Sequence, residues 1–65
     1  MAMILAAARV NARLTQDQVC KELGMSKNTL VSYEAYKTKP DIERAKQLAA
    51  LYGCELDDIK WSDEE

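Results

Sequence analysis

Apolar residues recur every three or four positions along most of this chain, the spacing that places side chains on one face of an α-helix. No segment alternates apolar and polar residues between turn signals, which is the pattern that predicts a β-strand. The chain is therefore predicted to be all-α. The residues expected to face the core are Leu5, Ala8, Ala12, Val19, Cys20, Leu23, Leu30, Tyr33, Ile42, Ala45, Leu48, Ala49, Tyr52, Leu56 and Ile59.

Capping residues mark where the first two helices begin and end. An alanine-rich helix is expected over residues 3–13. Thr15 followed by Gln18 predicts a capping box, in which each side chain binds the backbone N–H of the other residue, so a second helix runs over about 16–23. Gly24 ends this helix, because glycine adopts the left-handed conformation without a steric penalty.

Three further helices follow from similar signals. Ser26 is expected to cap a third helix over about 27–35, and Asp41 a fourth over about 42–52. A short fifth helix is expected around residues 55–60. The fold class predicted from the pattern is thus a bundle of five helices.

The segment 14–40 combines a short turn with a helix whose start is polar, which suits DNA recognition. Lys27, Asn28 and Thr29 lie at the start of the third helix, and Ser32 follows one turn later on the outward side. The N-terminal end of the second helix of a helix-turn-helix meets base edges in the major groove. These four residues are therefore candidate base contacts.

The distribution of charge along the chain is compatible with DNA binding, although the chain as a whole is acidic. The 65 residues carry a net charge of -2. Residues 1–40 hold six lysines and arginines against three acidic residues, whereas residues 41–65 hold three against eight. Such asymmetry between the halves indicates a basic face and an acidic face, although an accidental distribution in an ordinary globular protein would look the same.

The chain resembles the phage Cro/repressor helix-turn-helix family, also called the xenobiotic-response-element family of bacterial regulators. The resemblance spans nearly the whole chain without a gap. It implies a five-helix, lambda-repressor-like DNA-binding domain, with the third helix in the major groove. The residues that carry it are Leu14-Thr15-Gln16, Leu23-Gly24-Met25-Ser26, Leu30, Tyr33-Glu34, Lys37, Pro40, Ile42, Leu48-Ala49, Tyr52-Gly53 and Leu56.

The resemblance also implies contacts with DNA phosphates. Gln16 would bind a phosphate at the start of the second helix, where the helix N-terminus also attracts anions. Lys37, Thr38 and Lys39, in the loop after the third helix, would hold the DNA backbone on the other side. The alternative is that these residues are ordinary solvated positions.

Among the candidate base contacts, Lys27 and Asn28 are the strongest. Lysine favours guanine O6 and N7, and asparagine pairs bidentately with adenine. Thr29 would lie near a thymine methyl or a phosphate, and the short hydroxyl of Ser32 is less selective. A lysine is unfavourable at the positive N-terminal end of a helix. Its presence there therefore favours a DNA contact for Lys27 over the alternative of an ordinary solvent-exposed residue.

The resemblance also implies one ion pair, and at one position the chain differs from the usual residue of the family. Arg9 stands where the family has an arginine that pairs with the residue equivalent to Glu34, so an Arg9–Glu34 ion pair is expected; the alternative is an exposed glutamate. Tyr36 stands where the family usually has glycine, and a left-handed tyrosine costs roughly 1 kcal/mol or more. The third helix is therefore expected to run slightly longer or the loop to differ, and the Tyr36 hydroxyl could lie on the DNA backbone.

A homodimer is the common form of this fold on two DNA half-sites. In similar proteins the last helix supplies the dimer contact, so Leu51, Ile59 and Trp61 are candidates for it. The alternative for Trp61 is that its indole folds back onto its own core.

The sequence therefore predicts a sequence-specific regulator of transcription that binds a double-stranded DNA operator, most simply a repressor of phage or prophage type. An antitoxin-like or other protein-interaction adaptor on the same scaffold remains open, because fold does not fix function. An enzyme is not expected, since there is no histidine, no nucleophile–base arrangement and no phosphate-binding glycine loop.

The remaining expectations concern ligands and location. No cofactor, metal or small-molecule ligand is expected, because Cys20 and Cys54 alone cannot fill a tetrahedral zinc site and fit better as small buried hydrophobes. No membrane segment or signal peptide is evident, so a cytoplasmic protein is expected. The chain is expected to hold one domain over residues 1–61, followed by an acidic tail over 62–65.

Overall fold

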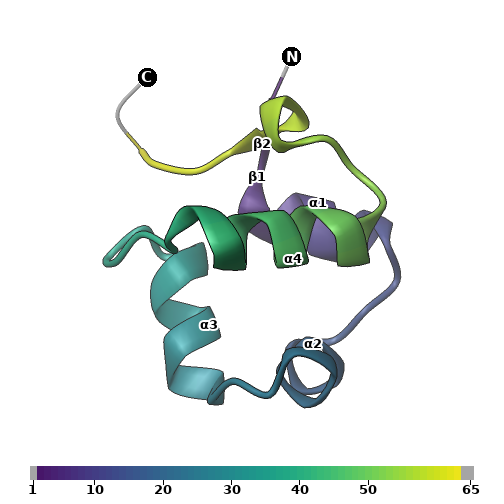
Figure 1. Cartoon of the computed structure of the whole chain (residues 1–65), viewed down its shortest axis with the longest axis vertical. Helices are drawn as coiled ribbons and strands as arrows, with labels where there is room; N and C mark the ends of the chain where they lie inside the picture. The colour runs from purple at the N-terminus through teal and green to yellow at the C-terminus, as the bar shows by residue number, and fades with distance from the viewer. Residues whose placement is uncertain (1, 64–65) are drawn as a thin grey trace.

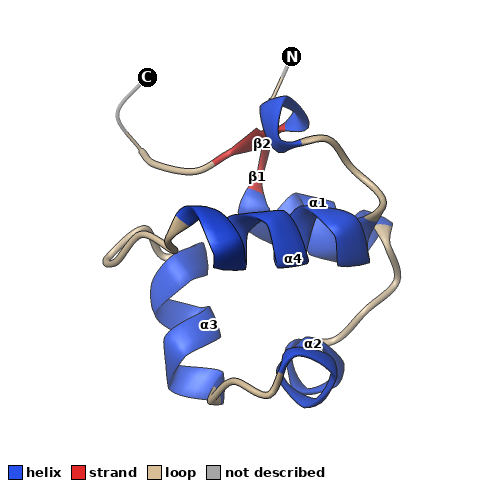
Figure 2. Cartoon of the chain, in the orientation of Figure 1, coloured by secondary structure: helices blue, strands red, loops and turns tan. Residues whose placement is uncertain are grey.

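The computed structural model describes residues 2–63 and is mostly helical. Within that range, no helix has both the length and the apolar character needed to cross a bilayer. The expected acidic tail is described only as far as Asp63, and its last two residues lie outside the described residues. In chain order the elements are β1 (Met3–Ile4), α1 (Leu5–Asn11), α2 (Gln16–Leu23), α3 (Lys27–Glu34), α4 (Ile42–Tyr52), a 3₁₀ turn η1 (Leu56–Asp58) and β2 (Ile59–Lys60) (Figures 1 and 2).

Side-chain caps set the starts of α2, α3 and α4, as predicted. Thr15 accepts a hydrogen bond from the Gln18 backbone N–H at 3.1 Å, and the Gln18 side chain accepts one from the Thr15 N–H at 2.8 Å, which completes the capping box. Ser26 and Asp41 cap the next two helices through their side-chain oxygens. Gly24, with φ of 65°, ends α2 in the left-handed conformation.

The structure is mostly helical, as predicted, but the expected count of five helices is not confirmed, and residues 2–63 differ from the prediction at both ends. The region around 55–60 forms only the one-turn η1 and the strand β2, and the first helix begins at Leu5. β1 and β2 instead pair in parallel, with Met3 opposite Ile59 and Ile4 opposite Lys60. Strands of two residues are too short to show the alternation that predicts a strand, and this pairing depends on a contact across nearly the whole chain.

The core lies between the helices and the strand pair. Leu5, Val19, Leu30 and Leu48 are less than 2% exposed, and β2 adds Ile59, which is 3% exposed. α4 and α1 lie side by side in Figure 1, and β1 and β2 lie at the opposite end of the molecule from α2. The core therefore supports α2 and α3 at one end of the molecule, and the strand pair covers the core at the other end.

One predicted core residue is at the surface. Ile42 is 62% exposed. It is the first residue of α4 and follows the cap residue Asp41, so it precedes the buried stripe that Ala45, Leu48 and Ala49 form. The helical period alone does not reveal where along a helix that stripe starts to meet the core.

Candidate nucleic-acid interface

The turn between α2 and α3 is held by backbone and side-chain hydrogen bonds. The Met25 N–H donates to the Cys20 carbonyl at 3.1 Å, which closes the turn after Gly24. Arg44 of α4 donates from Nη1 to the Leu23 carbonyl at 3.1 Å. This bond satisfies a carbonyl at the end of α2 that has no partner within the helix. The turn and the contact from α4 together hold α2 and α3 at a defined angle. The role of Arg44 was not predicted, because its contact with Leu23 joins residues 21 positions apart.

The four candidate base contacts at the start of α3 differ in their exposure and in their hydrogen bonds. Lys27 and Asn28 are exposed, whereas Thr29 and Ser32 are half-buried. The Thr29 hydroxyl lies 2.8 Å from the hydroxyl of Ser26, whose oxygen also accepts the Thr29 backbone N–H. Lys27 and Asn28 are consequently the most accessible side chains at this helix start.

A shallow depression joins α3 to the loop that follows it. Of the eight candidate DNA contacts, five line this depression, together with Tyr33. Gln16, Lys27 and Lys37 do not line it. Tyr33 was expected in the core, and it packs against the core while one side borders the depression. The five candidates that share the depression are Asn28, Thr29, Ser32, Thr38 and Lys39.

Tyr36 adopts the left-handed conformation that the family usually gives to glycine. Its φ is 61°, and α3 ends at Glu34, so the expected lengthening of this helix is wrong. The Lys37 N–H donates to the Ser32 carbonyl at 2.9 Å, as in a glycine-terminated helix. The loop that carries Lys37 is therefore tied to the last turn of α3.

The hydroxyl of Tyr36 is held by two hydrogen bonds within the chain, at a half-buried position between the start of α1 and β2. It accepts a hydrogen bond from the Leu5 N–H at 3.0 Å and donates one to the Lys60 carbonyl at 2.7 Å. The suggested contact of this hydroxyl with the DNA backbone is therefore wrong. The Leu5 N–H stands at the start of α1, where a helix has no internal acceptor, so Tyr36 supplies one.

Arg9 and Glu34 form an ion pair at the meeting point of α1, α2 and α3. Arg9 Nε lies 2.7 Å from Glu34 Oε2, and the two side chains are 15% and 8% exposed. Arg9 also donates from Nη1 to the Leu14 carbonyl at 2.8 Å. The side-chain amide of Gln16 donates to Glu34 Oε1 at 2.9 Å. One carboxylate thus connects all three helices, and it holds the amide of the candidate phosphate contact Gln16.

Lys27 has a partner that the sequence did not indicate. Its Nζ lies 3.3 Å from Asp17 Oδ1, in the first turn of α2. The two residues are ten positions apart on different helices, and an acidic residue is common in a first helical turn because it interacts well with the helix dipole. Nothing in the local pattern therefore marked Asp17 as part of this surface.

Tyr52 is a buried residue close enough to Arg9 and Glu34 to be affected by their charges. Its side chain is 6% exposed, and its hydroxyl has no partner among the described residues. Burial raises the pKa of Tyr52 from 10.0 to about 12, the nearby carboxylate of Glu34 adds to the rise, and Arg9 opposes it. The hydroxyl therefore stays protonated at physiological pH.

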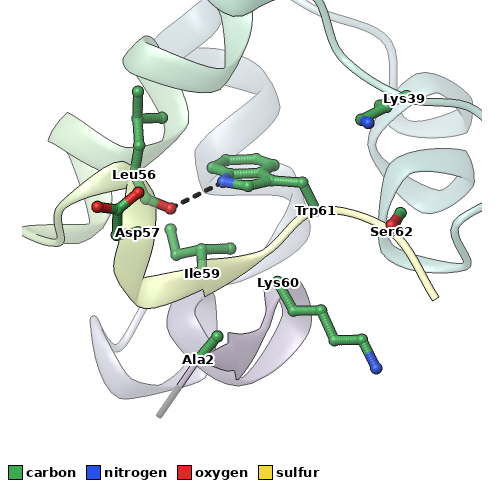
Figure 3. A pocket seen from close by; sticks show the side chains of 8 residues that line it. All are labelled: Ala2, Lys39, Leu56, Asp57, Ile59, Lys60, Trp61 and Ser62. Carbon is green, nitrogen blue, oxygen red and sulfur yellow. Dashed lines mark hydrogen bonds between the residues drawn. The ribbon is translucent and has the colours of Figure 1, made fainter. Parts of the chain in front are cut away.

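The candidate dimer contacts differ in how much surface they offer. Ile59 is buried in the core of its own chain at 3% exposure, so its side chain offers little surface to a partner. Figure 3 shows the Trp61 indole turned back toward η1, where its Nε1 donates to the Leu56 carbonyl at 3.0 Å. Trp61 and Leu51 are half-buried and pack against the core. Within one chain, the contacts of Trp61 thus agree with the alternative that its indole folds back onto its own core.

The profile of the helix-turn-helix family matches residues 5–59. The chain belongs to the Cro/C1-type helix-turn-helix family. It is therefore a helix-turn-helix domain of the class found in DNA-binding transcriptional regulators. The matched range runs from the first residue of α1 to the first residue of β2, so the family accounts for the whole core described above.

Three relatives in this family are similar to the chain. An uncharacterized HTH-type transcriptional regulator of Methanocaldococcus jannaschii is 35% identical over 46 residues, covering 71% of this chain and 70% of the relative. One from Archaeoglobus fulgidus is 30% identical over 57 residues, covering 88% and 80%. The cryptic phage CTXphi transcriptional repressor RstR of Vibrio cholerae is 35% identical over 51 residues, covering 78% of this chain but 46% of RstR. No solved structure is a significant match.

Proposed function

We propose that this helix-turn-helix domain binds a double-stranded DNA operator sequence-specifically, with α3 in the major groove, and that it represses transcription. The observation that carries the proposal is the depression that joins the start of α3 to the following loop. It brings candidate base contacts and candidate phosphate contacts from two segments onto one surface. A regulator needs both, because phosphate contacts fix the register on the duplex and base contacts read its sequence.

The proposed roles follow from exposure and chemistry. Lys27 and Asn28, the most accessible side chains at the helix start, would read base edges, with Ser32 and Thr29 beside them. Lys37, Thr38 and Lys39 are exposed in a loop that is tied to α3, so they would bind phosphates at a fixed distance from the bases that α3 reads.

Gln16 would bind a phosphate from the start of α2. Its amide nitrogen carries two hydrogens, of which Glu34 accepts one. The second hydrogen remains available to a phosphate oxygen. Because Gln16 is the first residue of α2, the helix N-terminus would add its own attraction for the same anion.

The proposal includes a homodimer, because two-fold dimers are the usual way for this fold to read two half-sites. Trp61 and Ile42 border an apolar depression on α4 and the C-terminal segment, which Pro40, Ala45 and Leu56 also line. This depression is the proposed dimer contact, and Leu51, which does not line it, is a separate candidate. Sedimentation over a range of concentrations, with and without operator, tests it; a mass that stays monomeric throughout would count against the dimer.

Selection of bound sequences from a random duplex pool tests the DNA-binding proposal. We expect one enriched sequence, bound with an affinity that falls steeply as salt rises, because lysine–phosphate contacts release counterions. An absence of enrichment, or binding that does not respond to salt, would support an adaptor function on this scaffold. A transcription assay on a promoter that carries the enriched site then distinguishes repression from activation.

The proposal also includes a repressor role and a cytoplasmic location. The similarity to RstR, which is named a phage repressor, supports a repressor of phage or prophage type. A cytoplasmic protein would meet operator DNA directly. Both parts are open to test by expressing the chain in cells that carry a reporter gene under the enriched site.

A further inference from the structure

The Asp17–Lys27 ion pair places a negative charge on the surface that we propose for DNA. Asp17 Oδ1 lies 3.3 Å from Lys27 Nζ, and the two side chains are 78% and 58% exposed. A carboxylate on such a surface is repelled by DNA phosphates. An exposed pair of this kind also adds little to the stability of the fold. Asp17 also interacts favourably with the N-terminus of α2, but its pairing with Lys27 adds a cost for DNA binding that the small stability of the pair does not offset.

The donor and acceptor pattern of the pair matches one kind of base pair. In the major groove guanine presents the acceptors O6 and N7, and its partner cytosine presents the N4 amine as a donor. Lys27 supplies only donors, and the ionised Asp17 supplies only acceptors. The two side chains, already adjacent in the protein, are together complementary to the major-groove edge of a G·C pair. A phosphate group, by contrast, presents only acceptors and attracts Lys27 alone.

We propose that Asp17 is a specificity-determining residue that reads one G·C pair together with Lys27. The proposal rests on the DNA-binding function proposed above. On DNA of unrelated sequence, Asp17 neutralises Lys27, so this lysine contributes little to general attraction for phosphates. On the operator, Lys27 donates to guanine and Asp17 accepts from the cytosine amine, so both charges keep a partner.

The test compares Asp17→Asn with Glu22→Gln. Both variants remove one negative charge from α2, and Glu22 is an exposed residue at the other end of that helix, without an ion pair among residues 2–63. Each is titrated, over a range of salt concentrations, against the duplex enriched from the random pool and against a shuffled duplex of the same length. Thermal unfolding of each variant verifies that the fold is retained.

Asp17→Asn should raise the affinity for the shuffled duplex about threefold or more and steepen its slope of log affinity against log salt by about 0.9, the value for one added phosphate contact. The affinity for the enriched duplex should rise less, so the ratio between the duplexes should fall. In that duplex, replacing the G·C pair that Lys27 reads by A·T should cost the variant less than the unmodified chain. Glu22→Gln should leave the ratio nearly unchanged.

Two results would overturn the role of Asp17. In one, Asp17→Asn and Glu22→Gln change both duplexes alike. In the other, the effect of Asp17→Asn persists when Lys27 is also replaced by alanine, which would show that it does not act through Lys27. Both leave DNA binding itself intact. If the unmodified chain enriches no duplex, the proposed function fails and this inference fails with it, so the two failures are distinguishable.

Discussion

The hydroxyl of Tyr36 donates a 2.7 Å hydrogen bond to the backbone carbonyl of Lys60. It connects the loop after α3 to β2, although the two residues are 24 positions apart in the chain. The same hydroxyl accepts the Leu5 N–H at the start of α1. A tyrosine at the position of the usual glycine therefore keeps the left-handed backbone and adds a connection between three segments, which offsets the cost of its conformation.

We expect Tyr36→Phe to lower the free energy of unfolding by about 1–3 kcal/mol, because it leaves the Leu5 N–H and the Lys60 carbonyl without this partner. The ring and its backbone conformation are retained, so the loss reports the hydroxyl alone. Urea unfolding followed by Trp61 fluorescence measures it. Tyr33→Phe is the matched control, since the Tyr33 hydroxyl has no hydrogen bond within residues 2–63. Equal losses in the two variants would contradict this role.

The Arg9–Glu34 pair should show strong energetic coupling. Its side chains are 15% and 8% exposed, so removal of one partner leaves a poorly solvated charge and should cost roughly 3 kcal/mol. A double-mutant cycle with Arg9→Met and Glu34→Gln should give a coupling energy of at least about 1 kcal/mol. A coupling energy near zero would show that the pair does not hold α1 to α3.

Lys27 and Lys37 should respond differently when replaced by alanine. Lys27→Ala should weaken operator binding by about 1–3 kcal/mol and relax the preference at one base pair, because a base contact is lost. Lys37→Ala should weaken enriched and shuffled duplexes alike and reduce the salt slope by about 1. Titration of both variants against both duplexes makes the comparison. The assigned roles are reversed if Lys37→Ala is the variant that changes sequence preference.

Tyr52→Phe should leave the free energy of unfolding unchanged or raise it by up to about 1 kcal/mol at pH 7. The substitution removes a buried hydroxyl that has no partner, and replacing an unsatisfied polar group by hydrogen relieves its desolvation penalty. Denaturation by urea measures the change. A loss of more than about 1 kcal/mol would mean that the hydroxyl is stabilised by a contact that the structure does not contain.

The pKa of Tyr52 also predicts how stability depends on alkaline pH. The folded chain holds this pKa at about 12, against 10.0 for an unperturbed tyrosine. Between these values the unfolded chain loses the proton that the folded chain retains, so stability present below pH 10 is lost as pH rises toward 12. At pH 11 the loss from Tyr52 should be on the order of 1 kcal/mol. Measuring the free energy of unfolding of the unmodified chain and of Tyr52→Phe at pH 9 and pH 11 isolates the loss that is due to Tyr52. An equal fall in both chains between these pH values would contradict the prediction.

Sequence reasoning succeeded where a few adjacent residues determine the structure. The Thr15–Gln18 capping box, the caps Ser26 and Asp41 and the left-handed Gly24 all act within one helical turn, and they placed α2, α3 and α4 correctly. The resemblance to a family added the Arg9–Glu34 contact, whose partners are 25 positions apart.

Several of the errors involve contacts between distant segments. The pairing of β1 with β2 depends on residues from the two ends of the chain, and strands this short leave no periodic signal. Tyr36 was expected to lengthen the third helix or to change the loop, because its partners Leu5 and Lys60 could not be identified without the fold. The same limit hid the pairing of Asp17 with Lys27 across two helices.

The parallel pairing of Met3–Ile4 with Ile59–Lys60 has a consequence for biosynthesis. A core completed by Ile59 cannot close before that residue has left the ribosome. Contacts of such long sequence separation also slow folding, because the loop must close before they form. We therefore expect Leu5 and its neighbours to stay incompletely covered until Ile59 has been synthesised and β2 has paired with β1.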